Sequence, residues 1–265
     1  MADARTGSRK GMLNALGLHR SELRAWAMYD WAVSSMQTVI TTAVFPIYFI
    51  QVAGADRTPE AATQSLGYAN TVAAIVIALL APILGAVADF KAAKKRFLFA
   101  FMLIGVVATA GMFFIDHGEL LFASALFILS IAGATGSMTF YEALLPHIAT
   151  DEEIDRVSTA AYAIGYLGGG LLLAINLAWI SNPGLLGLPS GDGITADQAT
   201  LPARLAFVSV GVWWLLFSIP VMRTVPEPPR TIESDERSTA NPFTVAFSRL
   251  GETLREMRQY KQAFL

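Results

Sequence analysis

The chain has 265 residues, of which 54% are hydrophobic and only 15% are charged. Soluble domains usually carry about 25% charged residues. Here the apolar residues fall in long runs, which argues against a soluble domain and for a polytopic membrane protein. The net charge of −2, without a long basic block, gives no indication of nucleic-acid binding, and the absence of cysteine excludes disulfides and thiolate chemistry.

The N-terminal residues 1–24 are polar and contain no apolar segment of the kind that signal peptides have. We therefore expect a cytoplasmic tail with no cleavable signal peptide. The first apolar stretch would then serve as its own membrane-insertion signal.

Six apolar stretches follow, each close to the ~20 residues needed to cross a hydrocarbon core of about 30 Å. They are Ala25–Ile50, Leu66–Ala88, Phe97–Ile115, Leu120–Leu145, Val157–Ile180 and Leu205–Met222. Between them, Thr150–Asp155 is predicted to be an acidic loop and Ser181–Pro202 an irregular outer loop. The predicted fold is all-α and integral to the membrane, with one six-helix bundle over 25–222 and a cytoplasmic segment over 223–265.

The distribution of Lys and Arg predicts the orientation, because cytoplasmic loops are enriched in these residues. Of the 19 cations, 17 fall in the two tails and in the loops that join an even span to an odd one. Arg57 and Arg204 fall on the other side. Both termini are therefore expected in the cytoplasm.

The first span carries an aspartate in an otherwise apolar segment. At about 1.5 Å rise per residue, Asp30 lies about 9 Å beyond Arg24, below the headgroups. An ionised carboxylate costs about 2.5–3.5 kcal/mol there, so such residues normally face a bundle interior or a watery cavity. Other polar side chains share the helix, namely Tyr29, Ser34, Ser35, Gln37, Thr38, Thr41 and Thr42. The pattern predicts a helix that lines a wet passage, with Asp30, Tyr29 and Gln37 as substrate or coupling residues.

The inner end of the second span carries a compact motif, GAVADFKAAKKR, that begins at Gly85. Gly85 would permit close helix approach and Asp89 would end the span. The cations Lys94, Lys95 and Arg96 would hold the short loop inside. On its own, this is an ordinary positively charged inner loop capped by an aspartate.

The same motif resembles the loop signature of the major facilitator superfamily, in which this loop braces the inner gate. Phe90 and Ala92 stand where that signature has a basic residue and a second glycine. The resemblance implies a gating role for Gly85, Asp89 and the three cations that follow.

Four segments narrow the resemblance to one branch of the superfamily. They are ELRAWAMYDWAVSSMQTVITTAVFPIYF, FYEALLPHIA, RVSTAAYAIGYLGGGLLLAIN and GVWWLLFSIPVMRTVPEP. Over Glu22–Pro228 the chain resembles the N-terminal half of the autophagy-type vacuolar effluxer branch of that superfamily. Val33 and Glu142 depart from it, since asparagine is usual at both places. The resemblance implies a facilitator-type bundle with a 3+3 inverted repeat. The branch has bacterial members, which implies a place in a bacterial cytoplasmic (inner) membrane, and its fungal members are associated with amino-acid efflux.

Glu142 is the second acid at membrane depth, near the inner end of the fourth span. In the facilitator arrangement, spans one and four both line the central cavity. Two carboxylates in one low-dielectric space favour protonation of at least one, which suits proton coupling by Asp30 and Glu142, with Tyr141 beside them. Alternatively, Glu142 is solvated at the interface or paired with Arg156 or Lys95.

Gly165 and Gly169 in the fifth span have the small-xxx-small spacing that lets two helices approach closely. This contact could rock during transport or could be static packing. Asn176 could bond a neighbouring helix or a substrate. The three histidines form no cluster at ligand spacing, so no metal or cofactor is expected.

Beyond the sixth span, VPEPPR stops the helix and a polar linker follows. Apolar residues then recur at alternating spacings of four and three, at Phe243, Phe247, Leu250, Leu254 and Met257. This is typical of an amphipathic helix that lies on the inner membrane face. A cytoplasmic helix packed on the loops is the alternative.

Together these features predict a secondary active transporter of small polar solutes such as amino acids, with alternating access and protons as coupling ion. Its partners would be the bilayer, the solute and a second six-helix half, because a facilitator needs about twelve spans. That half is missing from this chain, separately encoded, or supplied by a homodimer. The alternative is a non-transporting scaffold or receptor, or an inactive half-transporter. An enzyme is not expected, because no nucleophile elbow, phosphate loop or metal motif is present.

Overall fold

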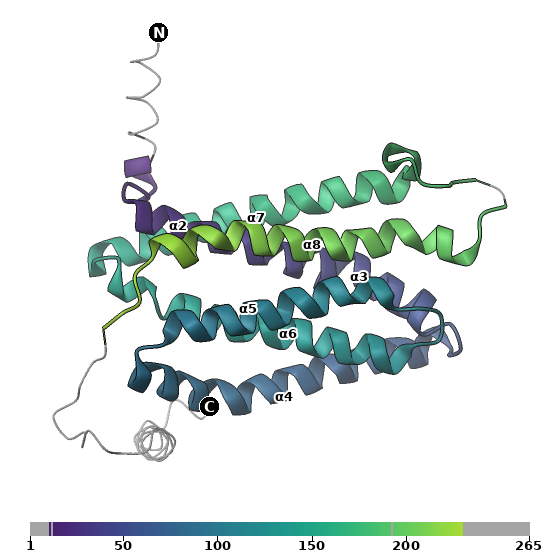
Figure 1. Ribbon diagram of the computed structural model, residues 1–265, viewed down its shortest axis with the longest axis horizontal. Helices are drawn as coiled ribbons and strands as arrows, with labels where there is room; N and C mark the ends of the chain where they lie inside the picture. Colours follow the sequence, from purple (N-terminus) through teal and green to yellow (C-terminus); the bar gives the residue numbers. More distant parts are fainter. Residues whose placement is uncertain (1–10, 12, 192, 230–265) are drawn as a thin grey trace, which may run out of the picture.

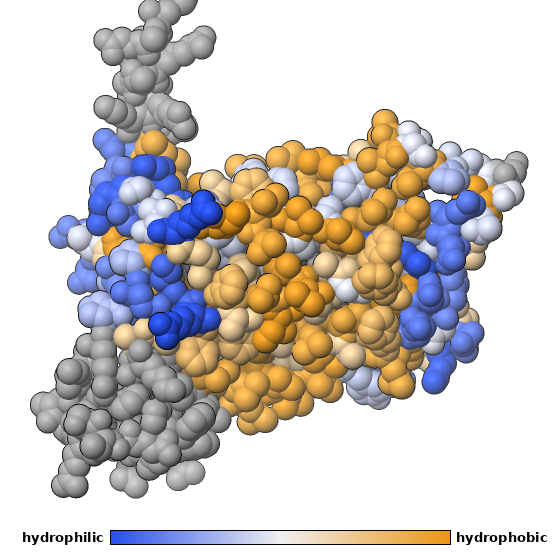
Figure 2. Space-filling view, viewed as in Figure 1, coloured by the Kyte–Doolittle hydropathy of each residue, from blue (hydrophilic) through white to orange (hydrophobic). Residues whose placement is uncertain are grey.

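The computed structural model describes residues 11, 13–191 and 193–229, with the backbone alone for 82–83 and 86–91. Six long helical segments run side by side along the long axis of the molecule (Figure 1), and no strand occurs in these residues. Each segment is long and apolar enough to cross a membrane. A broad apolar band separates two hydrophilic ends (Figure 2). The predicted all-α membrane fold with six spans is confirmed, while the amphipathic helix predicted over 243–257 lies outside the described residues.

The first span is one continuous helical run, Ser21–Ala53, made of α2 (Ser21–Ser35), η1 (Met36–Ala43), α3 (Val44–Tyr48) and η2 (Phe49–Ala53). The second and third spans are α4 (Pro59–Lys91) and α5 (Lys94–Gly111), which ends in the 3-10 turn η3 (Met112–Phe114). The remaining spans are α6 (Leu120–Glu142), α7 (Asp151–Ser181) and α8 (Ala196–Thr224), with the 3-10 turns η4 (Leu145–His147) and η5 (Pro183–Leu186) between them.

The acidic segment Thr150–Asp155 is not the predicted loop, because it contains the start of α7. Glu153 accepts a hydrogen bond from the Thr150 amide at 3.0 Å and completes a capping box. Acidic side chains in a first helical turn are stabilised by the unpaired amides and the helix dipole. The predicted outer loop is likewise shorter, since a second capping box between Thr195 and Gln198 starts α8 at Ala196.

The first span is not a regular α-helix, because η1 and η2 are π-helical. Pro46 follows η1 by one turn. Its ring crowds the carbonyl of Thr42, four residues earlier, and it has no amide hydrogen to donate. A wider turn before the proline relieves that clash, and the Thr42 hydroxyl there donates to the Gln37 carbonyl at 2.9 Å.

Helix packing follows the 3+3 repeat. α2 packs mainly against α7 and α8, and α6 packs mainly against α4 and α5. In the repeat, α2 corresponds to α6, α4 to α7 and α5 to α8. This correspondence turns the contacts of α2 into the contacts of α6, and the contact between α5 and α8 corresponds to itself. Since successive spans alternate in direction, the two triplets run in opposite senses, as in an inverted-topology repeat.

The close approach predicted at Gly85 is not seen among the described residues, because no described atom lies within 4 Å of a Cβ built there. The tight crossing occurs instead between α5 and α6. A Cβ on Gly133 would lie 2.4 Å from the backbone nitrogen of Gly105. Glycine lets these two backbones touch, which is a common way of packing helices in membranes.

The turn between α4 and α5 holds Ala92 in the left-handed region, with φ +48°. An L-residue pays roughly 1–2 kcal/mol there, whereas glycine does not. Ala92 is also where the facilitator signature has its second glycine.

We therefore expect Ala92→Gly to stabilise the protein by about 1 kcal/mol, because glycine relieves this strain. The measurement is the thermal unfolding midpoint in detergent. Ala93→Gly is the matched control, because Ala93 has φ −129° and carries no left-handed strain for glycine to relieve. A midpoint for Ala92→Gly that is no higher than that of Ala93→Gly would contradict the expectation.

Candidate functional site

A cavity of about 760 Å³ lies between α2, η1, α6 and α7. Four of the five predicted substrate or coupling residues line it: Asp30, Gln37, Tyr141 and Glu142. The remaining lining side chains are Trp26, Val33, Ser34, Thr38, Thr42, Ala134, Thr135, Met138, Ser158, Thr159, Tyr162 and Tyr166. Spans one and four therefore share a cavity, as expected, and span five adds a third wall that was not predicted.

Asp30 is buried against α7, with 8% of its surface exposed. Its Oδ1 accepts a hydrogen bond from the Ser34 hydroxyl at 3.2 Å. A Cβ on Gly165 would lie 2.8 Å from that same carboxylate oxygen. No described residue forms an ion pair with Asp30, so the described part of the chain supplies no counter-charge for this buried carboxylate.

The glycines of α7 pack directly onto the first span. A Cβ on Gly169 would lie 2.8 Å from the Ser34 carbonyl oxygen, and one on Gly168 would lie 2.5 Å from the Trp31 ring. The small-xxx-small pair Gly165 and Gly169 therefore forms a close helix contact, to which the structure adds Gly168. A rocking motion at this contact remains a prediction.

The π-helical turn changes which threonine faces the cavity. At about 100° per residue, a regular helix would place Thr41 about 20° from the direction of Asp30 and Thr42 about 120° away. In the structure Thr42 lines the cavity, and the Thr41 hydroxyl instead lies 3.6 Å from the Met36 sulfur. Apolar periodicity alone could not reveal this shift, although Pro46 was a signal that the helix could not stay regular.

Glu142 is the last residue of α6 and is exposed. Neither of the pairings considered for it is present. The Lys95 ammonium instead donates to the Met222 carbonyl at 3.0 Å, and no ion pair joins Glu142 to Arg156 in the described part of the chain. The second carboxylate is therefore solvent-accessible at one end of the cavity.

Aromatic side chains join α2 to α6 beside the cavity. The Trp26 ring stacks on Tyr141 with centroids 4.2 Å apart, and the Trp26 indole donates to the Tyr141 carbonyl at 2.9 Å. Tyr29, predicted to contact the solute, is fully buried with its ring 5.0 Å from Tyr141 and does not line the cavity. Tyr29 lies behind the cavity wall, where its ring packs against Tyr141, which lines the cavity.

Two of the three predicted gating cations, Lys94 and Lys95, tie helix ends together within the bundle. Lys94 Nζ lies 3.0 Å from His147 Nε2, at the end of span four. Lys95 binds the last turn of α8, and its backbone amide donates to the Glu227 carboxylate at 3.0 Å. Arg96 is exposed, and the side chain of Asp89 lies outside the described residues. Their role in gating remains a prediction.

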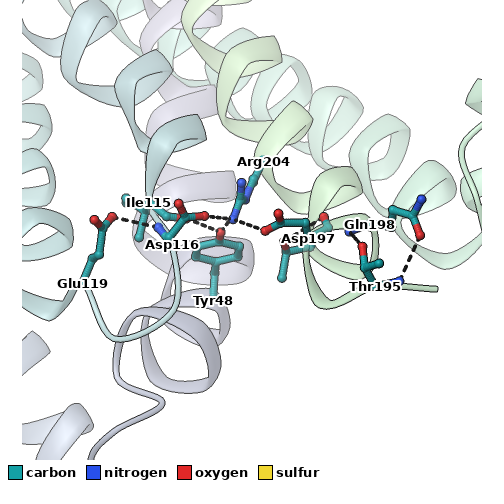
Figure 3. A network of polar contacts seen from close by, with 9 residues as sticks. Tyr48, Ile115, Asp116, Glu119, Thr195, Asp197, Gln198 and Arg204 are labelled. Carbon is teal, nitrogen blue, oxygen red and sulfur yellow. Dashed lines mark hydrogen bonds and ion pairs between the residues drawn. The ribbon is translucent and has the colours of Figure 1, made fainter. Parts of the chain in front are cut away.

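At the opposite end, Arg204 on α8 joins three elements (Figure 3). Its Nε donates to the Tyr48 hydroxyl at 2.9 Å, and its Nη2 donates to Asp116 in the α5–α6 turn. The Tyr48 hydroxyl in turn donates to the Ile115 carbonyl at 2.7 Å. Asp197 lies farther from Arg204, at 3.5 Å. Only 12% of the Arg204 side chain is exposed, so this network fastens the end of the first span to the sixth.

Replacing Arg204 by methionine is expected to cost about 1.5–3 kcal/mol, since hydrogen bonds to a charged partner are lost at a shielded site. Asp197→Asn should cost about 0–1 kcal/mol, because that pair is long and its carboxylate side chain is 75% exposed. Thermal midpoints of both variants test this. Equal losses for the two would show that Arg204 contributes only an ordinary surface ion pair.

Comparison with known proteins identifies the family of the chain. Residues 60–265 match the protein family described as vacuole effluxer Atg22 like. The chain belongs to this family. It is 32% identical over 242 residues to the uncharacterized MFS-type transporter YxiO of Bacillus subtilis (strain 168), covering 91% of this chain and 54% of the relative. It is also 33% identical over 98 residues to autophagy-related protein 22 of Yarrowia lipolytica (strain CLIB 122 / E 150), covering 36% of this chain and 14% of that protein.

The chain thus spans about half the length of the Bacillus relative. No solved structure matches it. The resemblance to the vacuolar effluxer branch of the major facilitator superfamily is confirmed, and the protein is a multi-pass membrane protein of a transporter family.

Proposed function

We propose that the protein is a secondary active transporter that moves a small polar solute, such as an amino acid, by alternating access and in exchange or symport with protons. The observation that carries the proposal is Asp30, a carboxylate buried on a spanning helix, without an ion pair to a described residue, in the wall of a 760 Å³ cavity. Such residues in membrane proteins mark substrate and proton pathways. Membership of a transporter family supports the same role.

In this proposal the described bundle supplies one side of the passage. Large apolar side chains are exposed along α4 and α7, among them Ile75, Leu79, Leu167 and Leu171. A second six-helix half would cover part of these faces and enclose the cavity, from the same reading frame, another gene or a second copy. Both termini would lie in the cytoplasm, with the protein in a bacterial cytoplasmic membrane.

Protons would act through Asp30 and Glu142. Uptake of a proton removes the uncompensated charge of Asp30, which otherwise carries a desolvation penalty. Glu142, exposed at the end of the same cavity, would exchange protons with the cytoplasmic solution. The Gly165 contact places α7 directly against Asp30. A change in the charge of Asp30 would therefore alter the contact between α2 and α7, the helix pair that has to move in this proposal.

The test is solute flux in proteoliposomes that contain the protein expressed from its complete reading frame. Labelled amino acids and other small polar solutes are offered over a range from about pH 5 to about pH 8, across which the proton concentration changes by about three orders of magnitude. We expect flux that depends on pH and on an imposed proton gradient. Flux that depends neither on pH nor on the proton gradient would rule out proton coupling. No flux of any solute would favour the scaffold alternative.

Sequencing downstream of Leu265 addresses the second half directly. Six further spans in frame would give a single-chain transporter. A stop codon would require a partner chain or a second copy, which the mass of the detergent-solubilised complex would distinguish.

A further inference from the structure

We infer that the transported solute is an organic cation whose ammonium group binds beside Asp30, an inference that rests on the proposed transport function. The described residues that line the cavity include two carboxylates, Asp30 and Glu142, but no lysine, arginine or histidine. The wall therefore presents negative charge alone. An anionic solute would meet two like charges, and a neutral solute would leave the ionised form of Asp30 without a partner.

The immediate surroundings of Asp30 leave its charge unneutralised. A single neutral donor, the Ser34 hydroxyl, reaches its Oδ1. On the α7 side stands Gly165, which has no side chain to offer. What remains exposed of the carboxylate belongs to the cavity lining, so a counter-charge can reach it only from the cavity. A buried charge retained without an internal partner is costly unless something else pairs with it.

Aromatic faces beside this carboxylate suit an organic ammonium. Tyr162 and Tyr166 lie one turn apart on α7, on either side of Gly165 in sequence, and each is 61% exposed. Their rings meet edge to face with centroids 4.8 Å apart, and their hydroxyls are hydrogen-bonded at 2.9 Å. Tyrosine faces attract ammonium groups through the ring quadrupole. Both rings line the cavity that contains Asp30.

The size and chemistry of the cavity favour an organic amine over a bare metal ion. A volume near 760 Å³ lies in the range of pockets that hold drug-sized molecules. Among the described residues, no three His, Asp or Glu side chains are grouped closely enough to hold a metal ion. The hydroxyls and the Gln37 amide could bond the polar remainder of the solute, while Met138 and Val33 would pack against its carbon chain.

The decisive experiment compares cationic probes with neutral counterparts of matched size and shape. Binding to the protein from its complete reading frame, in lipid nanodiscs, is measured by calorimetry for choline against dimethylbutanol, in which a carbon replaces the charged nitrogen. Cadaverine against pentanediol forms the second pair. We expect each cation to bind more tightly than its neutral counterpart by about tenfold or more, the value of one hydrogen bond or ion pair to a buried charge.

Variants assign that preference to the site. Asp30→Asn should abolish it while keeping the acceptor for Ser34, and Glu142→Gln should reduce it less because that carboxylate is exposed. Tyr166→Leu should weaken choline binding and Tyr166→Phe should preserve it. Glu60→Gln, an exposed carboxylate in the first turn of α4, is the control and should change nothing. Thermal midpoints no lower than that of the wild type show that each variant is folded.

The outcomes separate this inference from the proposed function. Equal binding of cations and neutral counterparts, or no binding of either cation, overturns the inference. Flux of a neutral or anionic solute in that case leaves transport standing. Cation binding that requires Asp30 but is accompanied by no flux of any solute overturns transport and leaves the cation site.

Discussion

Replacing Asp30 by asparagine is expected to reduce solute flux by about 10- to 150-fold, the equivalent of losing one charged interaction worth about 1.5–3 kcal/mol. The residual flux should no longer depend on pH. Asparagine has nearly the same shape and keeps an oxygen that accepts from the Ser34 hydroxyl, but it neither carries charge nor takes up a proton. The measurement is flux in proteoliposomes over the pH series used for the wild type.

The stability of this variant separates a functional charge from a structural one. Because no described ion pair depends on Asp30, its neutralisation should leave the thermal midpoint unchanged or raise it. A scaffold would differ from a transporter in flux: the double variant Asp30→Asn with Glu142→Gln would again gain or keep stability, but no flux would be lost because none existed. If Asp30→Asn retained pH-dependent flux, proton coupling would have to be assigned to another group, and Glu142 would be the first to test.

The sequence was sufficient for what depends on apolar length and on single residues. Six apolar runs of spanning length specify six helices, because backbone polar groups in a membrane must be paired within the helix. An aspartate inside such a run has few tolerable surroundings, which is why Asp30 could be assigned to a polar cavity before the packing was known. The depth of Glu142 followed from its distance to the end of the same span.

Other features depend on which helices meet, and no single span contains that information. Span five could be predicted as a helix, but only packing reveals that Gly165 touches Asp30 and that Tyr162 and Tyr166 complete the wall. Gly85 shows the reverse case, since a glycine with a plausible packing role has no described neighbour.

The two loop predictions that were wrong could have been corrected from the local sequence. The capping box at Thr150 and Glu153 marked the start of α7, and the same signal at Thr195 and Gln198 marked α8. Composition favoured loops there, because Thr150–Asp155 is strongly acidic and Ser181–Pro202 is rich in Gly and Pro. The hydrogen-bond chemistry of the helix ends overrode composition.

Gly169→Ala is expected to destabilise the protein by about 1–3 kcal/mol, whereas Gly170→Ala, one residue later, should stabilise it by about 0.5–1 kcal/mol. At Gly169 the new Cβ would lie 2.8 Å from the Ser34 carbonyl oxygen, which is backbone and cannot move aside without shifting the helix. Nothing described lies within 4 Å of a Cβ at Gly170, so only the helix preference of alanine acts there. The measurement is the thermal midpoint of both variants in the same detergent.

Gly165→Ala is the informative third member of this series. Its new Cβ would meet two side chains, the Ser34 hydroxyl at 2.6 Å and the Asp30 carboxylate at 2.8 Å, both of which can rotate away. The loss of stability should therefore be smaller than for Gly169→Ala, while the loss of flux should be larger relative to it, because the displaced group is the proposed coupling carboxylate. If stability and flux fell in the same proportion in both variants, α7 would be a static support and the proposed link between Asp30 and helix movement would be wrong.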